Sequence, residues 1–214
     1  MDIVHGTQNE PLTRREREKA AHRQEILDAA VRVFSRRGFA AATLDEIAQE
    51  AEFSKGAIYL YFPSKEDLLF NMIMDLGHFA MEGFKKVLCG AKSFREELTD
   101  LFTSAAEFMF THRERLKIAM SLHMISLSGL PDDAFMKICT HHQEMVGMLC
   151  ERTRKARENG EIRDVPIEAV AWMIHGSLDS MAVTKWGYGT VEELKEASLT
   201  FVDILFSGIE NKKE

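Results

Sequence analysis

The side chains best suited to chemistry in this sequence are histidines, cysteines and acidic residues between positions 139 and 150. His141, His142 and Glu144 are near neighbours. Consecutive residues of a helix point about 100° apart, however, so a metal site here would need further ligands. Cys139 and Cys150 are separated by about 16 Å if they share one helix, which is too far for a disulfide. Oxidation of a single thiol stays open.

The short motifs that mark common catalytic centres do not occur in the sequence. There is no phosphate-binding glycine-rich loop, His-Glu-x-x-His motif, Cys-x-x-Cys motif or nucleophile elbow. We therefore expect a protein that is not an enzyme and that uses no cofactor and no metal. The alternative from another class is an enzyme built on a helical bundle.

The composition is that of a soluble globular protein, with 214 residues, 45% hydrophobic and 29% charged. No apolar run approaches the roughly 18 residues that span a bilayer. The first 20 residues lack the apolar centre of a signal peptide. Three cysteines are too few for a disulfide framework. We expect a cytoplasmic protein that does not bind membranes.

Charge is distributed unevenly along the chain. The formal net charge is −7, whereas residues 11–65 hold ten Lys or Arg against eight Asp or Glu. A mildly basic end on an acidic body permits a local contact with DNA and discourages indiscriminate binding. This asymmetry alone does not identify a DNA-binding protein.

Helix start signals recur throughout the sequence. A hydroxyl residue followed three positions later by Glu is the capping-box pattern. It occurs at Thr13–Glu16, Thr43–Glu46, Ser93–Glu96, Thr111–Glu114 and Thr190–Glu193. Between these signals apolar residues recur every three or four positions. The sequence predicts an all-α protein of about nine helices.

Residues 26–65 have the pattern of a helix-turn-helix unit. One helix ends at Gly38, a short helix follows Thr43, and a third runs from Ala57 to Phe62 before Pro63. Apolar side chains of the three helices should form one small core: Ile26, Ala30, Val33, Phe34, Leu44, Ile47, Ala48, Ile58 and Phe62. A helix so short is not stable alone, but neighbours can hold it where it fits the major groove of DNA.

The same segment resembles the DNA-binding signature of the TetR (tetracycline-repressor-like) family of transcriptional regulators. That signature reads Phe-x-x-x-Gly-Phe, Thr-x-x-x-Ile-Ala, Ser-Lys-Gly-x-Ile/Leu-Tyr-x-Tyr/His-Phe and Lys-Glu-x-Leu. The corresponding residues, in order and without gaps, are Phe34 to Phe39, Thr43 to Ala48, Ser54 to Phe62 and Lys65 to Leu68. The match covers about 40 residues. The rest of the chain fits the family in length only.

The resemblance implies an N-terminal DNA-binding domain at residues 1–65, in which nine residues contact double-stranded DNA. They are Thr43, Ser54, Lys55, Gly56, Ala57, Tyr59, Leu60, Tyr61 and Lys65. Hydroxyl, ammonium and backbone N–H groups suit phosphates, and glycine permits close approach of the backbone. Base reading would then fall to Ala57, Leu60 and Tyr61, with the two apolar residues against thymine methyl groups.

Four basic residues precede this unit and form a possible arm for the minor groove or for phosphates: Arg14, Arg15, Arg17 and Lys19. Glu16 and Glu18 alternate with them. An exposed, charged helical extension is therefore the competing interpretation.

The resemblance further implies that residues 66–214 form a helical domain for effector binding and dimerisation. The last two helices would pair with their counterparts in a homodimer through two apolar stripes. One stripe is Ile167, Val170, Ala171, Ile174, Leu178, Met181 and Ala182, and the other is Leu194, Ala197, Phe201, Ile204 and Leu205. The alternative is that these stripes face their own core. Two recognition helices about 34–36 Å apart would read a palindromic operator.

We interpret the protein as a ligand-responsive repressor that an apolar small molecule releases from DNA. Methionine and aromatic side chains adapt to such ligands. The residues expected around the effector are Phe79, Phe102, Met109, Met120, His123, Met124, Phe135, Cys139, His142, Trp172, His175 and Asp179. Ordinary core packing is the alternative for each of them. A thiol- or metal-responsive DNA-binding regulator is the alternative function.

Overall fold

The computed structural model describes residues 13–125, 132–184 and 189–209, with side chains for all of these except 120–125, 132–135 and 182–184. This part of the chain folds into nine helices without a β-sheet, which confirms the predicted all-α class. None of the described helices is both long enough and apolar enough to cross a membrane.

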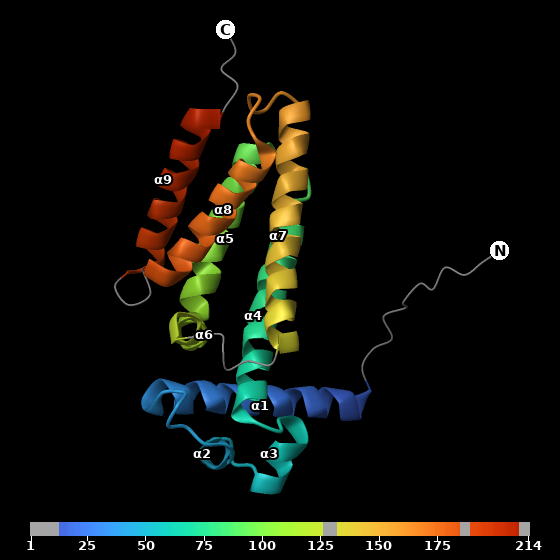
Figure 1. Ribbon diagram of the computed structural model, residues 1–214, viewed down its shortest axis with the longest axis vertical. Helices are drawn as coiled ribbons and strands as arrows, with labels where there is room; N and C mark the ends of the chain where they lie inside the picture. The colour runs from blue at the N-terminus through green and yellow to red at the C-terminus, as the bar shows by residue number, and fades with distance from the viewer. Residues whose placement is uncertain (1–12, 126–131, 185–188, 210–214) are drawn as a thin grey trace, which may run out of the picture. The chain divides into compact units, whose positions relative to one another are not determined.

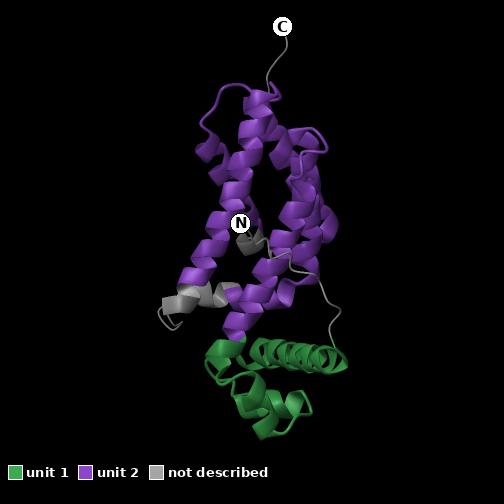
Figure 2. Ribbon diagram, turned by 90° about the vertical axis from the view of Figure 1, so that its right-hand side faces the viewer, with its two compact units in different colours: residues 1–68 green, residues 69–214 purple. Residues whose placement is uncertain are grey.

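The chain divides into two compact units, which Figure 2 colours separately. The first, residues 1–68, contains α1 (Arg14–Arg37), α2 (Leu44–Glu50), α3 (Lys55–Tyr61) and the first residues of α4 (Lys65–Val87). The second, residues 69–214, contains the rest of α4 and five further helices (Figure 1). These are α5 (Phe94–Thr111), α6 (Arg113–Ile125), α7 (Asp132–Glu158), α8 (Ile167–Thr184) and α9 (Val191–Ile209).

The first unit has the small core that the apolar spacing predicts. All nine predicted core residues are buried, and Ile26, Ile47 and Ile58 have no exposed surface. They come from α1, α2, α3 and, for Phe62, the residue directly after α3, so each short helix is held by apolar side chains. Fully burying one such side chain contributes about 1.5–3 kcal/mol.

Local capping fixes where most helices begin. The capping boxes at Thr13, Thr43 and Ser93 are confirmed, and Thr190 exchanges the same pair of bonds with Glu193. A helix also begins near Thr111, as predicted, but α6 starts two residues later, at Arg113. The backbone N–H of His112 donates to the carbonyl of Phe108 at 2.9 Å, so α5 continues through Thr111.

Two helix pairs organise the second unit. Helix α5 packs against α9 and α7 packs against α8, and α5 also contacts α8 (Figure 1). The core between them combines aromatic and aliphatic side chains: Phe94, Leu98 and Phe102 of α5, Leu149 of α7, Ile174 of α8, and Val202 and Phe206 of α9.

Most of the predicted dimer seam faces this core instead of the surface. Ile167, Val170, Ile174 and Leu178 of α8 are buried, as are Leu194 and Leu205 of α9. The apolar residues that α8 and α9 expose are different: Trp172 (70% exposed), Met173 (50%), Leu199 (44%) and Ile204 (68%). Of these only Ile204 was in the predicted stripes, because helical spacing does not indicate which apolar face meets the core.

A buried ion network joins α5, α7 and the segment after α7. The Nε atom of Arg152 lies 2.5 Å from the Glu97 carboxylate, and the two side chains are 5% and 1% exposed. The Arg152 guanidinium also lies 3.5 Å from Glu161 and donates to the carbonyl of Lys92. Glu97 accepts a further bond from the backbone N–H of Gly90 at 2.6 Å. Each buried charge is thus paired.

Removing Arg152 should therefore destabilise the protein strongly. We expect Arg152→Met to lower the free energy of unfolding by about 3–5 kcal/mol, because Glu97 would remain buried without its counter-charge. Adding Glu97→Met should recover much of that loss. Urea unfolding followed by circular dichroism measures both. Arg154→Met is the control, since the exposed Arg154–Glu151 pair should contribute about 1 kcal/mol or less.

Candidate nucleic-acid interface

Helix α3 has only seven residues, as does α2. The Ser54 side chain caps its start by accepting from the backbone N–H of Ala57 at 3.2 Å. Ile58 and the flanking Phe62 are buried in the unit core. The turn before it places Glu52 in the left-handed region, with φ of 59°. Helix α3 is therefore held at its start, along its inner face and at its end.

The outer face of α3 presents side chains that the core does not use. Leu60 is 84% exposed and Tyr59 is 52% exposed. Gly56 leaves open space, because a Cβ built there meets no atom within 4 Å. A leucine this exposed contributes little to the fold, so the face is available to a partner surface such as a DNA groove.

Lys55 at the start of α3 is exposed but already engaged. Its ammonium forms an ion pair with the carboxylate of Asp45 in α2. A phosphate contact by Lys55 would therefore compete with Asp45, and it would gain from the Coulomb attraction to the DNA backbone. Asp45 thereby tunes how much positive charge α3 offers.

The hydroxyls of Thr43 and Ser54 are occupied by capping in this structure. The Thr43 Oγ1 accepts from the backbone N–H of Glu46 at 3.2 Å and donates to its carboxylate at 3.1 Å. The hydrogen bond from the Thr43 backbone N–H lowers the pKa of Glu46, because it favours the ionised carboxylate. Both hydroxyl oxygens accept a hydrogen bond from a backbone N–H at a helix start. A phosphate bound at either place would contact a hydroxyl that already caps a helix.

Lys65 has a role that sequence reasoning missed. Its Nζ atom donates to three backbone carbonyls, those of Phe39 at 3.0 Å, Ala40 at 3.0 Å and Ala42 at 3.2 Å. A lysine ammonium has three protons, so none is left for the phosphate contact expected from the resemblance. The Nζ atom also lies 4.9 Å from the centre of the Phe39 ring. We assign Lys65 to holding the loop between α1 and α2.

Tyr61 points back toward α1 instead of standing fully exposed. Its hydroxyl lies 3.2 Å from Nδ1 of His22, and its ring packs edge-on to the rings of His22 and Phe53. Ala57, the other predicted base contact beside Leu60, is half-buried. Of the predicted base-reading residues, Leu60 is thus the one that projects furthest.

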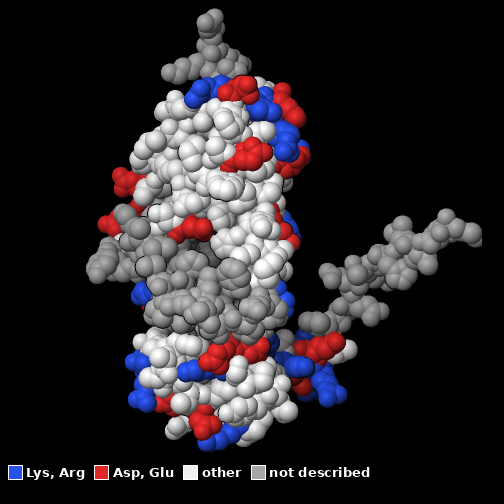
Figure 3. All heavy atoms as spheres, viewed as in Figure 1, with Lys and Arg blue, Asp and Glu red and all other residues white. Residues whose placement is uncertain are grey.

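Ion pairs fasten α1 to α2. Glu50 of α2 lies 2.6 Å from Arg32 and 2.5 Å from Arg36, both of α1. Arg37 lies 2.7 Å from Glu46. The hydrogen bonds from Arg36 and Arg32 lower the pKa of Glu50. These pairs use much of the positive charge near α2, and Figure 3 accordingly shows basic and acidic side chains interspersed over the first unit.

The four basic residues of the predicted arm lie in the first turns of α1. Arg14, Arg15, Arg17 and Lys19 are all exposed, and Arg14 lies 2.8 Å from Glu18 in an i,i+4 pair. This arrangement is the charged helical extension that the sequence left open as the alternative. Contact with DNA by these residues stays a prediction.

The described members of the predicted effector set differ in their burial and surroundings. Phe102 lies in the core of the second unit, where its ring centre is 4.7 Å from that of Phe201. Phe79 is 54% exposed and stacks on His112, Trp172 is exposed, and Met109 and Cys139 are half-buried. The side chains of Met120, His123, Met124 and Phe135 lie outside the described residues. Among the described side chains of the set, His142, His175 and Asp179 come together.

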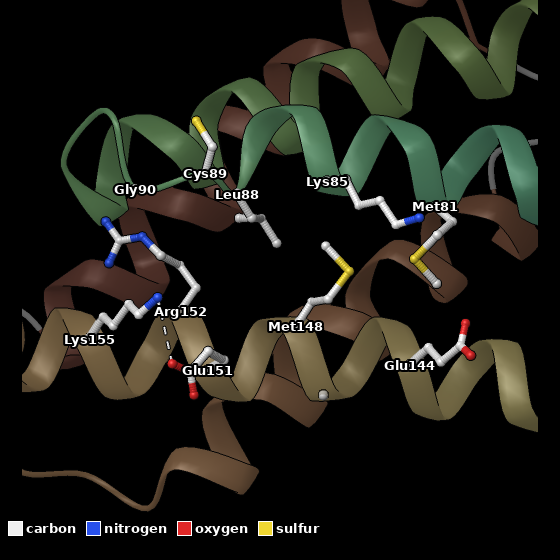
Figure 4. Close-up of a pocket in the computed structure, with 11 residues that line it drawn as sticks. Met81, Lys85, Leu88, Cys89, Gly90, Glu144, Met148, Glu151, Arg152 and Lys155 are labelled. Carbon is white, nitrogen blue, oxygen red and sulfur yellow. Dashed lines mark ion pairs between the residues drawn. The ribbon is translucent and has the colours of Figure 1, made fainter. Parts of the chain in front are cut away.

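A groove that the sequence did not suggest lies between the end of α4 and α7. Its volume is about 620 Å³, within the range of small-molecule sites. Figure 4 shows Leu88 and Met148 pointing toward each other across it. Lys85 and Lys155 at its rim are paired with Glu82 and Glu151 respectively, so the rim is nearly balanced in charge. None of the predicted effector residues lines it.

Comparison with known proteins agrees with this architecture. The family model described as "Bacterial regulatory proteins, tetR family" matches residues 26–72, which run from α1 into α4. The HTH-type transcriptional repressor KstR2 of Mycolicibacterium smegmatis is 28% identical over 152 residues, 71% of this chain and 73% of the relative. The fatty acid metabolism regulator protein of Bacillus subtilis is 25% identical over 213 residues, 92% of this chain and 100% of the relative.

The solved structure of the transcriptional regulator FadR from Bacillus subtilis in complex with stearoyl-CoA has the same fold. The TM-score is 0.70 at 23% identity, covering 87% of this chain and 99% of that one. All three of these proteins are regulators and none is described as an enzyme, which confirms the expectation that this chain is not one.

The role of Lys65 can be separated from DNA binding by stability measurements. We expect Lys65→Met to lower the free energy of unfolding by about 1–3 kcal/mol, because three carbonyls lose their donor. Lys55→Met is the matched control. Its exposed pair with Asp45 should contribute about 1 kcal/mol or less. Equal unfolding midpoints in urea for the two variants would contradict the structural role of Lys65.

Proposed function

We propose that this chain, which belongs to the TetR family of bacterial regulatory proteins, is a repressor that binds a palindromic operator as a homodimer and is released by an apolar effector. The observation that carries this proposal is α3. It is a seven-residue helix whose inner face closes a core and whose outer face exposes Tyr59 and Leu60. A helix held in this way is the part that helix-turn-helix proteins insert into the major groove.

On DNA, the start of α3 would face the phosphate backbone and its outer face the bases. Lys55 supplies charge, Tyr59 a hydroxyl and Gly56 room for close approach, while Ser54 and Thr43 lie at helix starts. Leu60 would touch thymine methyl groups, with Ala57 behind it. Neither apolar side chain forms hydrogen bonds to bases, so DNA shape would contribute much of the specificity. Tyr61 would support α3 through its contact with His22 of α1, and Lys65 would hold the loop between α1 and α2.

The dimer would form through the exposed apolar residues of α8 and α9. Trp172, Met173, Leu199 and Ile204 give these helices an apolar surface that the core of one chain does not cover. Figure 3 shows little positive charge on the visible face of α8 and α9. Large apolar side chains exposed in this number are typical of interaction sites when they form one patch. A two-fold dimer would place the same patch on both chains, as an isologous interface requires.

The effector we propose is a large apolar molecule. Two solved structures with a similar fold have names that indicate large apolar ligands. FadR of Bacillus subtilis was solved with stearoyl-CoA, and KstR2 of Mycobacterium tuberculosis is named a ketosteroid transcriptional regulator. In this chain the groove between α4 and α7 has methionine and leucine on its floor, and such side chains repack around varied apolar ligands. Effector binding would favour a dimer state that no longer fits the operator.

The test of DNA recognition is capture of genomic fragments on the purified protein, followed by footprinting at two salt concentrations. We expect a palindromic site whose affinity falls steeply with salt. Lys55→Ala should weaken binding to every sequence and reduce the salt slope by about 1. Asp45→Asn should strengthen binding, because it frees Lys55. Lys92→Ala is the matched control, since Lys92 forms a similar exposed pair with Asp100 in the second unit.

The outcomes of this experiment are distinct. If Lys55→Ala and Lys92→Ala behave alike on the enriched site, α3 does not contact the DNA backbone. If no site is enriched even with refolded, ligand-stripped protein, the repressor proposal is wrong. When a site is enriched, stearoyl-CoA and a steroid are each added to the complex of protein and operator. Release of the protein from the DNA by one of them identifies the class of effector.

The dimer interface gives a separate prediction. Ile204→Glu should convert the dimer to a monomer and weaken operator binding by at least tenfold, because a charge would be buried between two copies. Sedimentation velocity measures the mass directly. Asp203→Asn, an exposed change one position earlier on α9, should leave the dimer intact. An unchanged mass for Ile204→Glu would place the interface elsewhere.

A further inference from the structure

Two histidines and an aspartate that are distant in sequence meet between α7 and α8. His142 comes from α7, and His175 and Asp179 lie one turn apart on α8. Taking one nitrogen or oxygen from each side chain, the three atoms lie within 4.8 Å of one another. The rings of the two histidines are arranged edge to face, with centres 5.1 Å apart.

His175 is the unusual member of this cluster. Its side chain is only 10% exposed. Its Nδ1 atom lies 3.2 Å from the Asp179 carboxylate, whereas its buried Nε2 atom has no hydrogen-bond partner. One ion cannot bind both nitrogens of an imidazole ring, because their lone pairs point away from each other. The candidate ligand atom of His175 is therefore Nδ1, which lies beside the Asp179 carboxylate.

We propose that His142, His175 and Asp179 bind a divalent first-row transition-metal ion, with zinc as the reference ion. Two imidazoles and one carboxylate are a ligand set typical of zinc, and a water would complete four-coordination. Bonds of about 2.0–2.1 Å in a tetrahedron hold ligand atoms about 3.3 Å apart. The 3.2 Å between His175 and Asp179 already matches that spacing. The exposed His142 needs to close the remaining distance of at most about 1.5 Å by side-chain rotation.

The chemistry selects among ions. Magnesium and calcium prefer sets of oxygen ligands, so a site with two imidazole nitrogens disfavours them. Copper(II) and nickel(II) suit imidazole and compete with zinc in the Irving–Williams order. The ion would connect α7 to α8, the two helices that pack together in the second unit. This inference does not depend on the proposed repressor function, because metal binding is measured without DNA.

The experiment is a zinc titration of the full chain after treatment with EDTA, in competition with a chromophoric chelator. We expect one ion per chain and a rise in melting temperature with zinc. His142→Ala should weaken binding by more than the roughly 10–100-fold typical of losing a supporting group. Because His142 is exposed, this variant should keep its fold, which circular dichroism of the metal-free protein verifies. Cobalt(II) should give the visible absorption of a tetrahedral complex.

Two controls make the result specific to the cluster. The first is Cys139→Ser, at a residue one turn before His142 on α7. The second is His78→Ala, which removes an exposed histidine of α4 in the same unit. Neither should change the zinc affinity. Asp179→Asn should weaken it. Zinc binding that His142→Ala and Asp179→Asn leave unchanged, or the absence of stoichiometric binding to the native chain, would overturn the proposal. In that case a proton shared by His175 and Asp179 explains the contact between them.

Discussion

Helix α3 has seven residues, and a helix of that length does not persist in water without outside contacts. Its geometry therefore depends on what surrounds it. Ile58 and Phe62 anchor it in the core of α1 and α2, and Ser54 caps its first turn. Lys65 fixes the loop before α2 by donating to three carbonyls. Each support leaves the outer face of α3 unoccupied.

Ion pairs of the first unit also hold its helices together. Arg32, Arg36 and Arg37 at the end of α1 pair with Glu46 and Glu50 of α2, and Lys55 of α3 pairs with Asp45. The positive charge of these four residues is thus balanced by acidic partners, in keeping with the net charge of −7 for the whole chain. A surface of this kind depends on shape and on a few exchanged ion pairs more than on bulk charge.

The second unit shows two ways of handling polar groups inside a helical domain. Arg152 and Glu97 are almost fully buried, and their mutual pairing and further hydrogen bonds compensate for lost hydration. His175 is buried nearly as deeply, yet one of its nitrogens has no partner. The charges of the first group are compensated within the chain, whereas His175 lies beside two further side chains that can bind a metal, His142 and Asp179. This difference is the reason to look for an ion at His175 and not at Arg152.

The sequence by itself determined the helices, the core of the first unit and the family. Capping boxes act within one turn, so Thr13, Thr43 and Ser93 were predictable. At Thr111 the same signal is present, but α5 runs on through this residue because the backbone N–H of His112 donates to the carbonyl of Phe108. The tertiary structure alone decided which apolar faces of α8 and α9 turn inward, because the helical period does not distinguish a core from an interface. It alone brought Lys65 to carbonyls 23 to 26 residues earlier, and His142 to a helix that starts 25 residues later. Such meetings depend on how helices pack, and no local pattern encodes that.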